Sequence, residues 1–173
     1  MPDIADILAA ARPRETVTRI CTAGDVAAEV DALTAELARV SEDWEPGDLT
    51  AVHPGREVAA KLADARERMR AAEVEFRFRY IGDRAYQDLL AAHPPADHKE
   101  AFDPASFPPA LIAASCIDPV MTEDQARELF EVVNEGQIKK LFDAAWDAHN
   151  DAPEAVPFSL AASALLAGLG GEK

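Results

Sequence analysis

Four side chains that could ligate a metal ion lie close together in this 173-residue chain: His93, Asp97, His98 and Asp103. Imidazole and carboxylate groups are common zinc ligands, but a zinc site needs three or four of them fixed around one point. No second cluster of suitable spacing completes this one, and the neighbouring prolines predict a loop. We therefore expect a solvated loop here and no bound metal.

A thiol nucleophile could be built from Cys116 and His149. The thiolate is the reactive form of cysteine, and an apolar environment disfavours that form. Cys116 lies in the apolar run of residues 111–117. The sequence therefore predicts a buried and inert thiol rather than a catalytic one.

Phosphate-binding motifs are missing from the sequence. The eight glycines form neither the dinucleotide fingerprint nor the P-loop pattern. Carboxylate pairs such as Glu123 and Asp124 lie in the first turn of a predicted helix. Their negative charges interact favourably there with the positive end of the helix dipole. We find no catalytic residue and no cofactor site in these patterns, and we expect a protein that is not an enzyme.

The chain is strongly acidic, since 32 acidic residues against 17 basic ones give a net charge of −15. Such a charge repels nucleic acids and anionic membranes, so we expect neither as a partner. No stretch reaches the roughly 20 apolar residues of a membrane-spanning helix. Two cysteines cannot make a disulfide scaffold, and residues 1–3 do not resemble the start of a secretory signal. A cytoplasmic location follows as an expectation.

The elements that must carry these side chains are mostly helical. We expect a mainly α fold with a small antiparallel β element, an α+β class, in which an elongated helical hairpin is inserted between two short strands. The expected parts are an amphipathic segment (1–14), a strand–hairpin–strand unit (15–82), a compact helical region (83–150) and an apolar, flexible tail (151–173).

The hairpin is predicted by two apolar stripes with alternating spacings of four and three residues. The first comprises Val26, Val30, Leu33, Leu37 and Val40; the second comprises Val58, Leu62, Ala65, Met69 and Ala72. Two such narrow stripes joined by a short loop should pack against each other as antiparallel helices.

Two strands are predicted to close the base of this hairpin. Residues 16–21 are rich in β-branched side chains, and residues 74–80 alternate apolar and charged ones. The second segment could also continue the preceding helix through Phe76 and Tyr80. We favour a strand, because two strands flanking a hairpin can pair antiparallel.

Further helices are expected over residues 83–90, 110–116 and 123–133, and a last one from residue 138 that closes a compact hairpin with its predecessor. Thr122 and Gln125 form a capping-box pattern before one of them. Asp25 and Asp83 are expected to cap two earlier helices. Between residues 96 and 109 we expect a loop anchored by its two phenylalanines.

Partner binding could involve two regions near the end of the chain. Phe142 and Trp146, four residues apart on a predicted helix, form either a partner-binding stripe or ordinary core, and the scarcity of aromatics favours core. The apolar residues of the tail are the other candidates: Val156, Phe158, Leu160, Leu165 and Leu169.

The order of these segments resembles the tail assembly chaperones of long-tailed bacteriophages and prophages, especially those with GC-rich genomes. The segments that carry the resemblance are residues 16–21, 24–25, 76–82, 85–90, 93–95, 102–104, 107–116, 119, 122–123, 136–137, 141–146, 150 and 156–159. The resemblance covers residues 15–163.

The resemblance implies a non-enzymatic role in the cytoplasm of the bacterial host. Members of the family bind the tape measure protein, keep it soluble, and recruit tail tube protein subunits around it, and they are not retained in the virion. Many are made in two forms, so a longer frameshifted form of this chain is an implied partner, beside a possible homo-oligomer.

Two other classes of protein fit the composition. One is a structural or adaptor component of a phage tail, which would remain in the virion. The other is an acidic DNA mimic that inhibits a DNA-binding protein, which requires carboxylates spaced like phosphates on one face.

Overall fold

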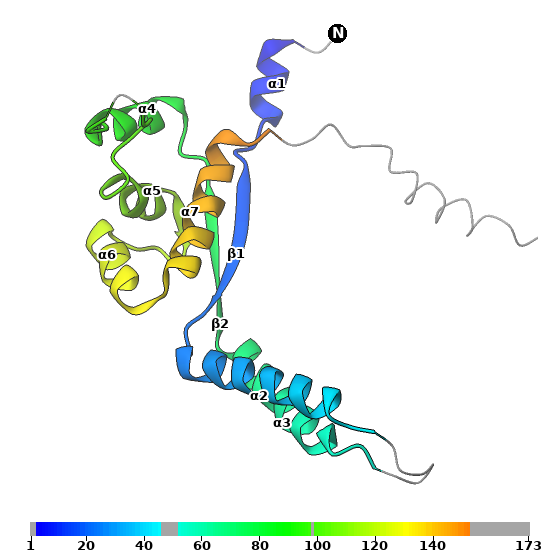
Figure 1. Ribbon diagram of the computed structural model, residues 1–173. Helices are drawn as coiled ribbons and strands as arrows, with labels where there is room; N and C mark the ends of the chain where they lie inside the picture. The colour runs from blue at the N-terminus through cyan, green and yellow to red at the C-terminus, as the bar shows by residue number, and fades with distance from the viewer. Residues whose placement is uncertain (1–2, 46–51, 98, 153–173) are drawn as a thin grey trace, which may run out of the picture.

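The computed structural model describes residues 3–45, 52–97 and 99–152. It is mostly helical with one small three-stranded antiparallel sheet, which confirms the expected α+β class (Figure 1). The elements in chain order are α1 (Ile4–Ala10), β1 (Glu15–Cys21), α2 (Gly24–Glu42), α3 (Gly55–Ala71), β2 (Glu73–Arg79), α4 (Asp83–Ala92), α5 (Phe107–Ser115), β3 (Cys116–Asp118), α6 (Glu123–Val132) and α7 (Glu135–Asn150).

The sheet has the order β1-β2-β3, and β1 pairs antiparallel with β2 along their whole length, from Glu15 opposite Arg79 to Cys21 opposite Glu73. Phe76 and Phe78 are buried, whereas the residues between and beside them are exposed. This alternation confirms the predicted strand, which spans Glu73–Arg79, rather than an extension of the preceding helix.

Helices α2 and α3 form the expected hairpin between β1 and β2, and Figure 1 shows it projecting from one end of the sheet as an arm. The α3 stripe is buried at Val58, Leu62 and Ala65, while α2 has no fully buried residue. Arg68 of α3 forms an ion pair with Glu29 of α2 at 2.8 Å, which joins the two helices of the hairpin. The arm is therefore two helices thick, with its own narrow apolar seam.

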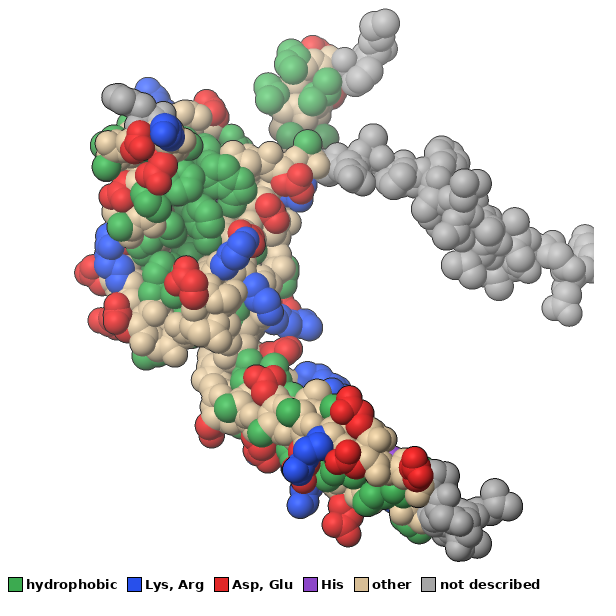
Figure 2. All heavy atoms as spheres, in the orientation of Figure 1, with side chains coloured by type: hydrophobic (Ala, Val, Ile, Leu, Met, Phe, Trp, Pro, Cys, Tyr) green, Lys and Arg blue, Asp and Glu red, His purple; other side chains and the backbone are tan. Residues whose placement is uncertain are grey.

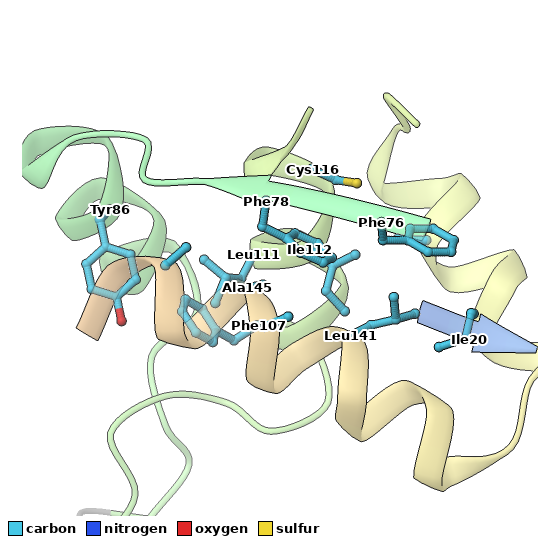
Figure 3. Packing of buried hydrophobic residues seen from close by; sticks show 13 residues of the cluster. Ile20, Phe76, Phe78, Tyr86, Phe107, Leu111, Ile112, Cys116, Leu141 and Ala145 are labelled. Atoms are coloured by element: carbon cyan, nitrogen blue, oxygen red, sulfur yellow. The ribbon is translucent and has the colours of Figure 1, made fainter. Parts of the chain in front are cut away.

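One hydrophobic core joins the sheet to the helices that follow it (Figure 3). Its largest fully buried side chains include Phe78 from β2, Phe107 and Leu111 from α5, and Leu141 from α7. Residues 15–82 and 83–150 thus contribute to the same core. α7 packs along β1 and β2, and α5 packs against both α6 and α7.

The region around α5 differs from the prediction. The helix begins at Phe107, not residue 110, because prolines are accepted in a first helical turn, where no backbone N–H is needed. It ends at Ser115, and Cys116 opens the unpredicted strand β3, which pairs with β2.

Helix capping matches the prediction in one place and differs in two. Thr122 and Gln125 form the expected capping box. Asp25 and Asp83 are not caps: each lies in the first turn, after the N-cap residues Ala23 and Gly82. Gly82 has a φ of 94°, a left-handed conformation that favours glycine over aspartate. Asn134 is the N-cap of α7, which begins at Glu135 rather than at residue 138.

The predicted compact hairpin of the last two helices is also not formed as expected. α6 and α7 make few contacts with each other, and both pack on α5 instead. The reason is that α5 buries residues on most sides, including Phe107, Leu111 and Ile112. Among the helices of the described part, none has both the length and the apolar character to cross a lipid bilayer.

Candidate functional site

An apolar groove opens between the loop before α5, the end of α6 and the start of α7. It has a volume of about 390 Å³. Its lining residues are Pro104, Ala105, Pro108, Phe130, Glu135, Gly136, Ile138, Lys139 and Phe142. Figure 2 shows hydrophobic side chains gathered on this face of the body, between α4 and α6.

The groove forms because three short elements meet around α5 without filling the space between them. α6 turns Phe130 toward the core, where it is only half-buried. The two prolines Pro104 and Pro108 stiffen the opposite wall, since a proline ring fixes its backbone φ. The result is a preformed apolar hollow with rigid sides.

An aromatic cluster continues from the floor of the groove across the surface. Phe102 lies at the centre of this cluster, with its ring centroid 4.4 Å from that of Phe107, 5.8 Å from Phe142 and 5.6 Å from Trp146. Phe107 is fully buried, while the other three rings are half-buried. Phe102 therefore anchors the loop, as predicted, whereas Phe107 belongs to the first turn of α5.

Phe142 and Trp146 are brought together by the structure. Their ring centroids lie 5.8 Å apart, and Phe142 lines the groove. Both rings pack against the core, as the core interpretation predicts, and both keep an exposed part. The remaining candidates, Val156, Phe158, Leu160, Leu165 and Leu169, lie outside the described residues.

Ile138 also lines the groove and is not among the binding candidates expected from the sequence. It stands one helical turn before Phe142 and two before Trp146, so all three share one face of α7. This four-residue spacing was available in the sequence. The proline wall was not, because it reaches α7 only through tertiary packing.

Charges of both signs border the apolar floor. Glu135 and Lys139 lie at the rim, and Lys139 bonds to Asp143 at 2.6 Å. An apolar floor with a mixed rim can hold an apolar side chain or helix face while polar groups remain in water. Nothing in this arrangement activates a nucleophile.

The candidate metal ligands that the structure describes form hydrogen bonds with residues near them in the chain. The Ser106 hydroxyl donates to Asp103 at 2.7 Å and lies 2.9 Å from Nδ1 of His93. The Ser106 hydroxyl and the Ala105 N–H lower the pKa of Asp103, because they stabilise its charged form. Asp97 accepts from the Lys99 N–H, and His98 lies outside the described residues. Within the described ranges, no group of three or more His, Cys, Asp or Glu side chains is arranged to hold a metal ion.

Cys116 and His149 each form hydrogen bonds with different backbone groups, and neither is bonded to the other. The Cys116 thiol donates to the Pro119 carbonyl at 3.1 Å, and burial raises its pKa. Nε2 of His149 accepts from the Ile81 N–H at 3.3 Å, so Nδ1 carries the proton that is donated to the Ala145 carbonyl at 2.7 Å. Burial lowers the pKa of His149, which favours this neutral form.

A second apolar surface lies on α1. Ile4, Ile7 and Leu8 are 65%, 50% and 70% exposed, and α1 contains no buried residue. An amphipathic helix with its apolar side in water has surface available for a partner.

Comparison with known proteins gives no relative for this chain. No family model matches it, and neither a curated protein nor a solved structure is detectably similar.

Proposed function

We propose that this chain is a tail assembly chaperone of a long-tailed bacteriophage or prophage. In this role it binds the tape measure protein in the cytoplasm of the bacterial host, keeps it soluble, and helps to recruit tail tube subunits. It catalyses no reaction and is not retained in the virion. A longer frameshifted form of the same chain would act beside it.

The observation that carries this proposal is the preformed groove on the body, with Phe142 on its floor. A client side chain that fills the groove removes apolar surface from water, which stabilises the complex by about 25 cal/mol per Å². The exposed apolar side of α1 adds a second surface of the same kind. The order of sequence segments supports the choice of family.

The acidic surface supports the same role. A net charge of −15 opposes further aggregation of a bound apolar client. The charge also keeps the groove from being a site for nucleic acid, whose phosphates it repels.

The test is co-expression with the tape measure protein encoded nearby, followed by measurement of the soluble fraction of that client. Ile138→Asp places a charge on the groove floor, and we expect the client to move to the insoluble fraction. Val132→Asp is the matched control, because Val132 is 79% exposed and does not line the groove. If Ile138→Asp keeps its circular dichroism spectrum and still solubilises the client, the groove is not the client site.

The tail is tested separately by deleting residues 153–173. The deletion should begin after Ala152, because Asp151 forms an ion pair with Arg14 at 2.8 Å and its N–H bonds to the Asp147 carbonyl. We expect this truncated chain to keep its fold and to lose co-solubility with the client. Unchanged co-purification would reject the tail as a client site.

The two alternative functions give different results. A structural or adaptor component would be found in purified virions by mass spectrometry, where a chaperone would be missing.

A DNA mimic needs a strip of carboxylates, whereas on the sheet surface Glu15 and Glu75 pair with arginines. Binding to a DNA-handling enzyme at low salt would favour the mimic.

A further inference from the structure

β1 is an edge strand, and no other strand of the described part pairs with its outer side. A groove of about 400 Å³ runs beside it, lined by Thr16, Val17 and Thr18 and by side chains of α7. In Figure 1 the outer side of β1 faces away from β2. The middle of β1 is therefore accessible to another strand.

The direction of the backbone groups in β1 can be deduced from the bonds at its two ends. The Tyr80 N–H donates to the Arg14 carbonyl, and the Thr22 N–H donates to the Ala72 carbonyl. Antiparallel pairs alternate between bonded and non-bonded, so the even-numbered residues of β1 bond to β2. The odd-numbered residues point their N–H and C=O groups outward, and the Cys21 carbonyl, which accepts from Gln137, agrees with this.

The open part of the edge comprises residues 15–19, because Gln137 occupies the edge at Cys21 and Arg14 is paired with Asp151. Its outward backbone groups belong to Glu15, Val17 and Arg19. The side chains of these three residues lie on the exposed face of the sheet, and Val17 is 53% exposed. An acidic, an apolar and a basic side chain therefore follow one another at every second residue of this edge.

We propose that β1 pairs antiparallel with β1 of a second copy of this chain, around a two-fold axis at Val17. In this register Val17 faces Val17 of the second copy, and Glu15 faces Arg19 of the second copy. These are the same residues whose outward N–H and C=O groups can form hydrogen bonds with the second copy. The hydrogen bonds and the charge pairs therefore require the same register. A parallel arrangement would place Glu15 beside Glu15, which is unfavourable.

The charges on either side of the new pairs also fit. Within one chain Arg79 contacts Glu15 at 2.6 Å and Arg19 contacts Glu75 at 2.7 Å. The proposed pairing joins these into one row across four strands, in which the charges alternate: Arg79, Glu15, Arg19 of the second copy, Glu75 of the second copy.

Side chains of α7 lie beside this edge, and the same two-fold axis would place them opposite α7 side chains of the second copy. Lys140 and Asp147 line the groove on either side of Asp143. Because α7 runs opposite to β1, the axis brings Lys140 toward Asp147 of the second copy. Asp143 lies near the axis, where two like charges would meet, but each is already bonded to Lys139.

The interface is short, and this determines its strength. The strand pairing involves five residues from each chain, far fewer than the roughly 20–30 residues a side of a stable complex. We therefore expect a reversible dimer that forms at high protein concentration and weakens as salt screens the charge pairs.

The experiment is sedimentation equilibrium on the full chain and on two charge-reversed variants. Glu15→Arg gives like charges in both pairs of a dimer, and so does Arg19→Glu. Each variant alone should associate at least about tenfold more weakly than the wild type. An equal mixture of the two should recover association, because every pair in the mixed dimer then joins an acid to a base.

The mixture also controls for folding, since two unfolded variants would not recover a specific dimer. Arg127→Glu on α6 is the matched control, because it reverses a charge far along the chain from β1, and it should associate like the wild type. A wild type that stays monomeric at the highest attainable concentration would overturn the proposal and mean that Glu15 and Arg19 protect the edge instead. Variants that associate normally, or a mixture that does not recover, would also overturn it.

Discussion

The imidazole of His149 stacks on the ring of Tyr86, with 4.8 Å between ring centroids and 23° between ring planes. Tyr86 belongs to α4 and His149 to the last turn of α7, so the pair fastens α4 to the end of α7. The two hydrogen bonds of His149, to Ile81 and Ala145, fix the ring in its neutral state. This contact therefore depends on pH.

We expect the protein to lose stability as the pH falls below about 6.5, the ordinary pKa of histidine. Burial lowers the pKa of His149 in the folded state, so below that pH the unfolded chain binds more protons and unfolding is favoured. In His149→Gln, the loss of unfolding free energy between about pH 7.5 and about pH 5.5 should be smaller than in the wild type.

Urea denaturation at both pH values measures this difference. The carboxylates titrate in both proteins, so comparing the two pH changes removes their contribution. His149→Gln should also be less stable at neutral pH, by about 0.5–1.5 kcal/mol, because the aromatic pair is lost. An identical pH dependence in the two proteins would contradict the neutral state of His149.

The core is expected to depend strongly on Phe78 of the central strand. Its side chain is fully buried between the sheet and the helices. Phe78→Ala leaves a cavity and should reduce the free energy of unfolding by about 3–5 kcal/mol. Val120→Ala is the control, because Val120 is 82% exposed, and its change should stay within about 0.5 kcal/mol. Similar urea midpoints for the two variants would show that Phe78 is not a core residue.

The capping box of α6 gives a third prediction. The Thr122 hydroxyl accepts from the Gln125 N–H at 3.2 Å, and the Gln125 side chain accepts from the Thr122 N–H at 2.9 Å. Thr122→Ala removes one of these bonds and should cost about 0.5–2 kcal/mol in thermal or urea unfolding.

Thr34→Ala is its matched control. Thr34 lies inside α2, is exposed, and donates to the Val30 carbonyl of its own helix. Alanine has the higher helix propensity, so this variant should be as stable as the wild type or slightly more stable. Equal losses in both threonine variants would mean that Thr122 does not act as a cap.

Local patterns predicted the elements whose side-chain spacing repeats over several turns or strand residues. The stripes through Leu33 and Leu62 identified the hairpin, and the alternation around Phe76 identified β2. In both cases the element is long enough for periodicity to be clear, and in the hairpin each helix packs on its neighbour along the chain.

The missed features depend on contacts distant in sequence or on a local exception. Cys116 enters a strand of three residues only because β2 offers an edge for it, and nothing near Cys116 in the sequence indicates this. The prolines around Phe107 are typical of a loop, although prolines are also accepted in a first helical turn.

The candidate site was predicted in part for the same reason. Phe142 and Trp146 were found by their helical spacing, and Ile138 could have been added by extending it. The wall formed by Pro104 and Pro108 could not be predicted, because it meets α7 only after α5 has packed on the sheet.

The last prediction concerns the arm formed by α2 and α3. Leu62 is 4% exposed and packs in the seam of the arm, and neither it nor Val58 belongs to the core of the body. Leu62→Ala should therefore accelerate amide hydrogen exchange in α2 and α3 and leave the amides of α5 and α7 unchanged, because the seam can open without the core. Lys61→Ala, at an exposed neighbouring position, should change neither set. Equal acceleration in α5 and α7 would show instead that the arm and the body unfold as one cooperative unit.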